Sequence, residues 1–421
     1  MGNSLLCSAS GKDELNPLSQ TTLMKSFPAR HCPVCEKTEP KSIFRQSFKA
    51  LSHGSLMTGF DLVVCTACGA GYADDIPKQT EFDRYYAEMS KYEYADRAGV
   101  QTETDLHRFR EVADLVTPYL KTNSRLLDIG CATGGLLAEF KRRDYQNLIG
   151  VDPSPACARL TEQLYGIAAK PLTIAMLGHL DKNVDVAFLT GVLEHIQDVD
   201  ASMNSVKSCL KNGGFVYFEV PDATRYDHHF SAPFQLFSME HVNYFSPVSL
   251  TNLMARHGFS VVFTKRLTRH LSPQAIEPAI GALFQRNLVQ ADDFKPIFDS
   301  ETEPALERYV TQSLALDQRI QKKIGDLVDQ EKRLAVWGVG THTLRLLETS
   351  RLSQAKIVCF IDSNVNYQGK TLAGAPVVAP SAFTDPNADV LISSQTAEAE
   401  IFQTITQRLL WPNVIHRIYD N

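Results

Sequence analysis

Two carboxylates and two glycines have the spacing of a nucleoside-binding turn. Asp128 and Gly130 end one apolar run, Gly134 opens an amphipathic segment, and Asp152 ends the next apolar run about 20 residues later. Glycines at a strand-to-helix turn let a ligand approach the backbone and the free N–H groups of the following helix. A carboxylate at the end of the second strand can accept hydrogen bonds from both hydroxyls of a ribose. The pattern predicts a bound nucleoside cofactor.

The acid at the start of the turn indicates which cofactor this is. A dinucleotide fingerprint reads G-x-G-x-x-G, whereas this turn reads Asp-x-Gly-x-Ala-x-Gly from Asp128 to Gly134. A carboxylate beside the turn repels a diphosphate and suits a ligand that carries an ammonium group and no phosphate. S-adenosylmethionine is such a ligand, and we expect Asp128, Gly130, Gly134 and Asp152 to bind it.

Two later blocks complete a known pattern. An apolar run beginning at residue 185 ends in Glu194-His195, and residues 210–221 predict a turn followed by a late strand. With the earlier blocks, they resemble class I S-adenosylmethionine-dependent methyltransferases over roughly residues 100–265. The resemblance implies a Rossmann-like α/β domain in which Glu194 and His195 lie beside the cofactor. Ala132, where many members have glycine, is a mild departure.

Four cysteines in two CxxC pairs predict a zinc site in front of this domain. The first pair is Cys32 and Cys35, and the second is Cys65 and Cys68. Four thiolates can converge tetrahedrally on one Zn²⁺ ion, and a site whose four positions are all filled by protein is structural. Strand-like runs in the gap suit a ribbon with an inserted hairpin. A disulfide pair or two separate redox motifs are the alternatives.

The segment after the late strand carries candidate catalytic side chains. It contains Glu240 and His241, and it should lie over the C-terminal edge of the strands, where ligands bind in such sheets. An imidazole is suited to proton transfer near neutral pH. The alternative for His241 is a structural role in fixing the loop.

The order of these parts resembles the sugar C-methyltransferases from about residue 30 onward. Those enzymes combine a zinc knuckle, a methyltransferase domain, the motif Glu-His-x-x-Tyr-Phe-Ser and a second nucleotide-type domain, and they methylate a nucleotide-linked 4-keto-deoxysugar at C3. The resemblance implies His241 as the base and Glu240 as its orienting or enolate-stabilising partner. This chain has Ser238 where the sugar-methylating members have a tyrosine, and a second family tyrosine corresponds to Tyr92 or Tyr94.

The elements that position these residues divide the chain into five parts. We expect an N-terminal arm, a zinc ribbon, the methyltransferase domain, a helical linker and a small Rossmann-like α/β domain, at residues 1–30, 31–80, 81–265, 266–330 and 331–421. In the resembling family, the last domain helps to form the acceptor site and holds the nucleotide. The tyrosine-rich stretch 85–94 predicts either a helix that caps the next domain or a lid over the cofactor or acceptor.

The composition narrows the classes of partner. The net charge is −6, with 44% apolar and 21% charged residues, as in an ordinary globular protein. No basic stripe suggests a nucleic-acid partner, and no apolar run approaches the ~20 residues of a membrane span. Nine cysteines, mostly in apolar strands or CxxC pairs, favour a reducing cytoplasm.

The favoured function is C-methylation of a nucleotide-linked keto-sugar. An O- or N-methyltransferase acting on another metabolite and a binding protein that senses S-adenosylmethionine are the alternatives. The acidic charge balance disfavours a zinc-guided RNA methyltransferase. The identity of the acceptor and the oligomeric state stay open at the level of sequence.

Overall fold

The computed structural model describes residues 26–52, 55–88, 101–180, 183–230, 232–272, 275–287 and 294–419. Most of the expected N-terminal arm, together with Tyr92 and Tyr94, lies outside these ranges. The arm was predicted to extend to residue 30, and this is wrong for its last residues. The backbone N–H groups of Ser26 and Phe27 donate to Asp75, and Arg30 is buried.

The N-terminal sheet is antiparallel and has the order β1-β2-β3-β9. Its strands are β1 (Pro40–Ser47), β2 (Gly59–Cys65), β3 (Gly71–Asp74) and β9 (Asn243–Tyr244). The first two strands are the expected hairpin between the cysteine pairs. β9 comes from a distant part of the chain and begins two residues after His241. The ribbon therefore pairs with the candidate catalytic segment through β3. Helix α1 (Gln79–Glu88) follows the ribbon.

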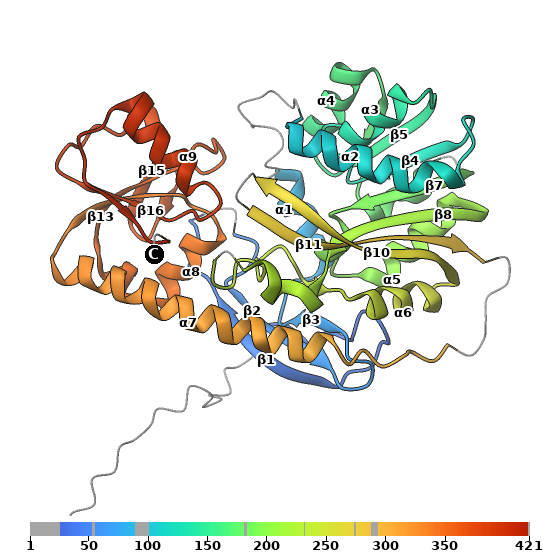
Figure 1. The fold of residues 1–421 in the computed structure, drawn as a ribbon, viewed down its shortest axis with the longest axis horizontal. Coiled ribbons are helices and arrows are strands. Elements are labelled where there is room, and N and C mark those ends of the chain that lie inside the picture. Colours follow the sequence, from blue (N-terminus) through green and yellow to red (C-terminus); the bar gives the residue numbers. More distant parts are fainter. Residues whose placement is uncertain are drawn as a thin grey trace, which may run out of the picture.

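The central sheet has seven strands in the order β10-β11-β8-β7-β4-β5-β6, and it is Rossmann-like as expected (Figure 1). Its parallel strands are β4 (Arg125–Ile129), β5 (Asn147–Asp152), β6 (Ala168–Pro171), β7 (Val184–Thr190) and β8 (Leu210–Pro221). Successive side chains of a strand point to opposite faces. Leu126 therefore packs under α2 (Glu103–Val116) and α3 (Gly135–Arg142), and Leu127 packs under α5 (Val199–Cys209) and α6 (Pro247–Arg256). Helix α4 (Pro155–Tyr165) follows β5.

The expected helical linker at 266–330 is wrong in its first part. Residues 266–286 belong to a hairpin of β10 (Phe259–Ser272) and β11 (Ala275–Arg286), and β11 pairs antiparallel with β8. The methyltransferase sheet therefore extends beyond residue 265. β10 is an edge strand with half-exposed side chains. It carries charges such as Lys265 and Arg266, so its apolar alternation is weak.

The second part of the linker is helical, as expected. α7 (Thr302–Asp329) is 28 residues long and runs along the molecule from the ribbon to the C-terminal unit (Figure 1). The carboxylate of its Asp317 accepts hydrogen bonds of 2.7 and 2.9 Å from Arg345, and both side chains are buried. None of the helices in the described ranges is both long and apolar enough to span a membrane.

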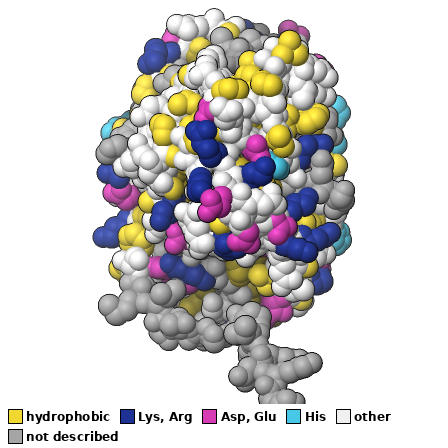
Figure 2. Space-filling view, turned by 90° about the vertical axis from the view of Figure 1, so that its left-hand side faces the viewer, with side chains coloured by type: hydrophobic (Ala, Val, Ile, Leu, Met, Phe, Trp, Pro, Cys, Tyr) yellow, Lys and Arg dark blue, Asp and Glu magenta, His cyan; other side chains and the backbone are white. Residues whose placement is uncertain are grey.

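The C-terminal unit has a six-stranded sheet in the order β14-β15-β13-β12-β16-β17. Its elements are β12 (Arg333–Trp337), α8 (Thr341–Thr349), β13 (Lys356–Ile361), β14 (Thr371–Leu372), β15 (Ala375–Val378), β16 (Asp389–Ile392), α9 (Glu398–Gln403) and β17 (Ile415–Arg417). β15, β13, β12, β16 and β17 are parallel, as expected for a small α/β unit. Figure 2 shows that acidic and basic side chains are interspersed on the face drawn there.

Candidate active site

The turn between β4 and α3 depends on its glycines. Gly130 and Gly134 have φ angles of 75° and 83°, in the left-handed region that favours glycine. A Cβ on Gly130 would lie 2.5 Å from Val192 Cγ2, and a Cβ on Gly134 would lie 2.6 Å from Thr161 Cγ2. Gly130 lines the adjoining cavity, whereas Gly134 is the N-cap of α3 and acts by shaping the turn.

The two predicted acids lie together at this turn. Asp152 Oδ2 accepts a hydrogen bond of 2.9 Å from Ala132 N, and its Oδ1 accepts one of 2.9 Å from Ser154 N. A carboxylate has about four lone-pair sites, so it can accept more hydrogen bonds than these two. Burial raises the pKa of Asp128 to about 7; the charge of Asp152 adds to the shift, and Arg108 opposes it. Among the described residues, Asp128 Oδ1 has no hydrogen-bond partner.

One cavity of about 700 Å³ contains both acids and extends to the predicted catalytic segment. Its walls come from the turn, from α1 and α2, from the loops after β7 and before β9, and from the C-terminal unit. Residues that the argument below uses are Tyr85, Tyr86, Arg108, Asp128, Asp152, His195, Glu240, Asn364 and Tyr367. Its size suits a cofactor together with part of an acceptor.

Hydrogen bonds connect four residues of the cavity lining, which we call the polar wall: Tyr85, Tyr86, His195 and Glu240. His195 Nδ1 lies 3.0 Å from the carbonyl oxygen of Glu240 and 2.9 Å from the hydroxyl of Tyr86. Because a carbonyl oxygen can only accept, we assign the proton of the neutral ring to Nδ1, which leaves a lone pair on Nε2. Tyr85 donates to Glu240 Oε1 at 3.0 Å. Burial, with the charge of Glu240 second, raises the pKa of Tyr85 far above its usual value, so the hydroxyl keeps this proton.

Two predicted residues lie behind this wall. The described residues that line the cavity include His195 and Glu240 but neither His241 nor Glu194. The ring centroid of His241 lies 4.8 Å from that of His195, edge to face. Glu194 is 1% exposed, and its Oε1 lies 3.9 Å from His195 Nε2. The structure therefore brings the two Glu-His pairs together.

Arg108 is a site residue that the sequence did not reveal. It comes from α2 and lines the cavity near Asp128. Its Nε donates to the buried Glu219 at 2.5 Å, while its Nη2 has no hydrogen-bond partner within the described part of the chain. One sequence signal could have found it. Arg108 is three residues after Asp105 and four before Val112, so this charged side chain lies on the same face of the helix as they do.

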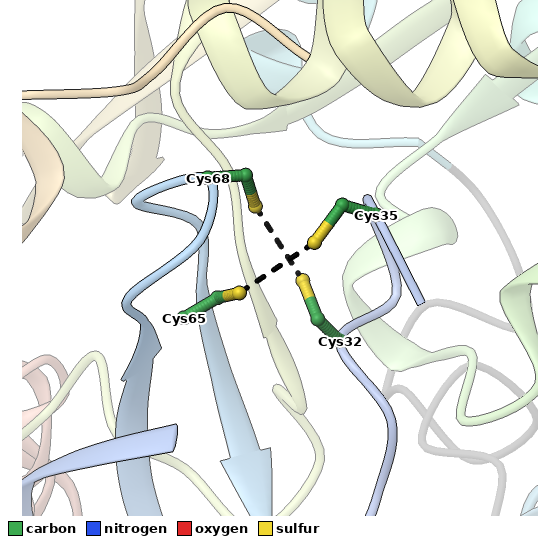
Figure 3. A group of neighbouring side chains, drawn as sticks. All are labelled: Cys32, Cys35, Cys65 and Cys68. Carbon is green, nitrogen blue, oxygen red and sulfur yellow. Dashed lines mark hydrogen bonds between the residues drawn. The ribbon is translucent and has the colours of Figure 1, made fainter. Parts of the chain in front are cut away.

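The four cysteines converge at the end of the ribbon (Figure 3). The sulfur atoms of Cys32 and Cys68 are 3.6 Å apart, and those of Cys35 and Cys65 are 3.5 Å apart. These distances exclude the S–S bonds of disulfides, which are about 2.05 Å long. A tetrahedron of sulfurs at about 2.3 Å from a Zn²⁺ ion has edges of about 3.8 Å. The donor set therefore fits a structural zinc ion.

Comparison with known proteins identifies two parts of the chain. Residues 104–263 match the family described as "Methyltransferase domain", and residues 330–410 match the family described as "C2185-like, N-terminal". A ubiquinone biosynthesis O-methyltransferase of Cereibacter sphaeroides is 34% identical over 108 residues, which are 24% of this chain and 43% of that protein. The corresponding protein of Alkalilimnicola ehrlichii is 31% identical over 100 residues, which are 22% of this chain and 40% of that protein. The match thus spans less than half the length of these relatives.

Solved structures are also similar to parts of the chain. The 1,6-didemethyltoxoflavin-N1-methyltransferase of Burkholderia thailandensis is 16% identical, with a TM-score of 0.41, and covers 59% of this chain and 99% of its own. The magnesium protoporphyrin IX methyltransferase of Synechocystis is 12% identical, with a TM-score of 0.37, and covers 50% and 98%. From its sheet order, its glycine turn and the matched range, the middle part of the chain is a class I S-adenosylmethionine-dependent methyltransferase domain.

Proposed function

We propose that the protein transfers the methyl group of S-adenosylmethionine to C3 of a nucleotide-linked 4-keto-deoxysugar. The observation that carries this proposal is the single cavity that joins the cofactor turn to a wall of imidazole and carboxylate side chains and to the C-terminal unit. A small acceptor in this cavity would meet both the cofactor and a base. When bound, the cofactor supplies an electrophilic methyl group.

Three charged residues would hold the cofactor. Asp152 ends β5 at the edge of the cavity and would accept from the ribose hydroxyls, and the Asp128 oxygen that has no partner among the described residues would accept from the ammonium group of the methionine part. Arg108 Nη2 can donate to the α-carboxylate beside it. The opposite charges of Asp128 and Arg108 thus match the two charges of the amino-acid end.

The acceptor would extend from the polar wall to the C-terminal unit. Asn364 and Tyr367 of that unit line the same cavity. They follow Asp362, whose carboxylate accepts from Val339 N and Asn364 N, both at 2.8 Å, in the glycine turn of the second α/β fold. A Cβ on Gly340 would meet no described atom within 4 Å, so this turn has room for a ligand. The acceptor would then place its sugar at the polar wall and its nucleotide at the turn around Gly340.

The base is one of two imidazoles. The resemblance names His241, and the cavity exposes His195, whose Nε2 carries the lone pair in the tautomer assigned above. Removal of the C3 proton leaves an enolate, and the hydroxyl of Tyr86, which lies against His195 Nδ1, could turn to donate to it. Glu240, which accepts from Tyr85, would orient this group.

Solvent exchange at carbon tests the proposal. Nucleoside-diphosphate 4-keto-deoxysugars are incubated with the enzyme and S-adenosylhomocysteine in deuterated buffer, and the C3 proton is followed by NMR. The wild type should exchange it, and replacement of the base should slow exchange by roughly two to four powers of ten. His195→Gln and His241→Gln identify which ring acts. Absence of exchange with every sugar of the panel would reject C-methylation.

O-methylation is the second candidate, because the curated relatives named above are O-methyltransferases of ubiquinone biosynthesis. The same base would then deprotonate a hydroxyl group. An O-methyltransferase causes no exchange at carbon in the presence of S-adenosylhomocysteine, and it forms a methyl ether when S-adenosylmethionine is supplied instead, so the NMR experiment run with each compound separates the two candidates.

We also propose that Cys32, Cys35, Cys65 and Cys68 bind one structural zinc ion. Metal analysis of protein purified without added zinc should find one ion per chain, and Cys65→Ser should lower both the metal content and the yield of folded protein. Fully folded protein without metal would contradict this assignment.

A further inference from the structure

We propose that Arg30 is a positioning residue that holds the wall of the acceptor cavity in place and is itself held by the four-cysteine site. The proposal rests on the proposed function only in treating this wall as the acceptor's wall. It assigns to the zinc ribbon a role in the geometry of the active site.

The guanidinium group of Arg30 lies between three separate segments. Arg30 is 7% exposed, and its backbone N–H donates to Asp74 at 2.8 Å. Its side chain donates to Val242 O at 2.9 Å, Ala73 O at 3.3 Å, Gln197 O at 2.7 Å, Ile196 O at 3.3 Å and Asn243 Oδ1 at 2.8 Å. A guanidinium group has five N–H donors in a fixed fork, which suits several carbonyl oxygens at once.

Two of these segments carry the polar wall. Ile196 and Gln197 directly follow His195, and Val242 and Asn243 follow Glu240 and His241. Further hydrogen bonds join the two segments directly: Val242 N donates to Glu194 O at 2.8 Å, and Asn243 Nδ2 donates to Leu193 O at 2.8 Å and to Ile196 O at 2.7 Å. Arg30 binds the carbonyl oxygens next to these links. It therefore fixes the distance between His195 and the Glu240 carbonyl that orients its ring.

The four-cysteine site determines where Arg30 lies. Arg30 is two residues before Cys32, and residues 31–39, all of them described, form neither a helix nor a strand. The knuckle is closed by short links such as Glu36 N to Cys32 O at 2.9 Å. A metal ion shared by both CxxC pairs would join this segment to β2 and the following turn, which carry Cys65 and Cys68.

Arg256 provides a matched control at the same knuckle. Its Nη2 donates to Pro33 O at 3.0 Å, and its Nη1 lies 3.0 Å from Glu36 Oε1. It belongs to α6 and pairs with Asp200 of α5, on the outer side of the knuckle. Arg256→Met therefore removes a half-buried arginine that contacts the ribbon from α6, without removing a donor to the two wall segments.

The test compares the zinc-loaded proteins Arg30→Met, Arg30→Lys and Arg256→Met with the wild type. Three readouts are taken: zinc content, affinity for S-adenosylhomocysteine, and the ¹⁵N spectrum of the histidine rings, in which His195 is assigned from His195→Gln. Hydrogen exchange of the Val242 amide, which donates to Glu194 O, is followed in parallel. None of these measurements needs the methyl acceptor.

In Arg30→Met we expect one zinc ion per chain and cofactor affinity within about twofold of the wild type. The Val242 amide should exchange at least about tenfold faster, and the Nδ1–H tautomer of His195 should lose its dominance. Arg30→Lys should give the same direction of change, since one ammonium group cannot serve both segments. Arg256→Met should leave both signals as in the wild type.

Removal of zinc from each protein completes the test. It should accelerate Val242 exchange by a clearly larger factor in the wild type and in Arg256→Met than in Arg30→Met, where the link through Arg30 is already lost. If Arg30→Met does not fold, Arg30→Lys and the wild type before and after metal removal decide the matter. Unchanged Val242 exchange and an unchanged His195 tautomer in the Arg30 variants would overturn the proposal, whatever the acceptor is.

Discussion

At the scale of single residues, the buried carboxylate of Asp128 in the glycine turn both destabilises the empty protein and offers an acceptor to a ligand. Asp128 is buried with a charged neighbour, Asp152, and part of its carboxylate has no hydrogen-bond partner among the described residues. Such a group weakens the empty protein whenever it is ionised. A cation beside it removes that cost, so the site is prepared for an ammonium group.

Asp128→Asn should therefore stabilise the empty protein and weaken cofactor binding. The folded-state pKa of Asp128 is raised from 3.8 to about 7, so the folded protein binds the proton of this carboxyl more tightly than the unfolded chain does. The stability that protonation of Asp128 gives is fully present below the unfolded pKa and is lost as the pH rises through about 7. The gain in unfolding free energy from the variant should be larger at pH 8 than at pH 5, on the order of 2 kcal/mol. Denaturant unfolding and calorimetry at both pH values measure the two effects.

The raised pKa of Asp128 also predicts how many protons are released when the ligand binds. Because an ammonium group favours the ionised carboxylate, S-adenosylhomocysteine binding near pH 6 should release up to one proton from the wild type. Calorimetry in buffers of different ionisation enthalpy detects this release, and Asp128→Asn should abolish it. Equal release by both proteins would assign the proton to another group.

Asp152 has a structural counterpart that serves as its control. Asp362 ends the corresponding strand of the C-terminal unit and accepts from two backbone N–H groups, as Asp152 does. Asp152→Asn should lower the affinity for S-adenosylhomocysteine by about tenfold or more, because two charge-assisted hydrogen bonds to the ribose are weakened. Asp362→Asn should leave that affinity unchanged. A similar loss in both variants would point to a general effect on folding.

The residues of the turn were readable from the sequence because each has a local reason. Gly130 needs a positive φ angle, and Asp152 ends a strand. Arg108 was missed because its role depends on Glu219 and Asp128, which lie on strands that only the folded sheet brings to α2. His195 was predicted beside the cofactor, but its contact with His241 is a tertiary fact.

At the scale of elements, the strands that carry the motifs were predictable, whereas the hairpin of β10 and β11 was not. The parallel strands are buried on both faces and read as apolar runs. β10 gains its place by pairing with β11 and so with β8, and its own sequence is charged and half-exposed. The pairing of β11 with the distant β8 leaves no local pattern, and the charges of β10 hide its alternation, which together explain the wrong expectation of a helix.

Removal of one partner of the buried ion pair between α7 and α8 should destabilise the protein strongly. Asp317 and Arg345 are each 4% exposed and form two hydrogen bonds, and Arg345 also lies 4.2 Å from the ring centroid of Phe234. Asp317→Ala leaves a buried guanidinium group without its partner, which costs about 3–5 kcal/mol. Asp329→Ala, which breaks the exposed pair with Arg351, should cause no measurable change in denaturant unfolding. If both variants change the free energy of unfolding equally, the buried pair of Asp317 and Arg345 does not hold α7 against the C-terminal unit.

At the scale of the whole molecule, the cavity belongs to more than one unit. The glycine turn of the methyltransferase domain, Tyr85 of α1 and Tyr367 of the C-terminal unit all line it. The ribbon pairs through β3 with β9, which follows Glu240. The order of the units could be predicted from their motifs. The resemblance implied that the last domain helps to form the acceptor site, but no local signal in the sequence marks Asn364 or Tyr367 as the residues that line the cavity with α1.

This arrangement separates the two ligands in a way that mutation can test. In the proposed function, Tyr367 contacts the acceptor and the glycine turn contacts the cofactor, so Tyr367→Ala should weaken acceptor binding and leave the cofactor in place. With the enzyme saturated with S-adenosylhomocysteine, the apparent Kd of a nucleoside-diphosphate sugar should rise about tenfold, as expected for the loss of one buried aromatic contact. The affinity for S-adenosylhomocysteine should stay within about twofold.

Val365→Ala is the control, since Val365 belongs to the same loop and is 48% exposed. It should change neither affinity. If Tyr367→Ala binds the sugar nucleotide as the wild type does, the C-terminal unit does not contribute to acceptor binding, and the acceptor must be small enough to be held by the methyltransferase domain and the polar wall alone. If both ligands are weakened equally, Tyr367 acts on the shape of the whole cavity, and the division into a cofactor end and an acceptor end is wrong.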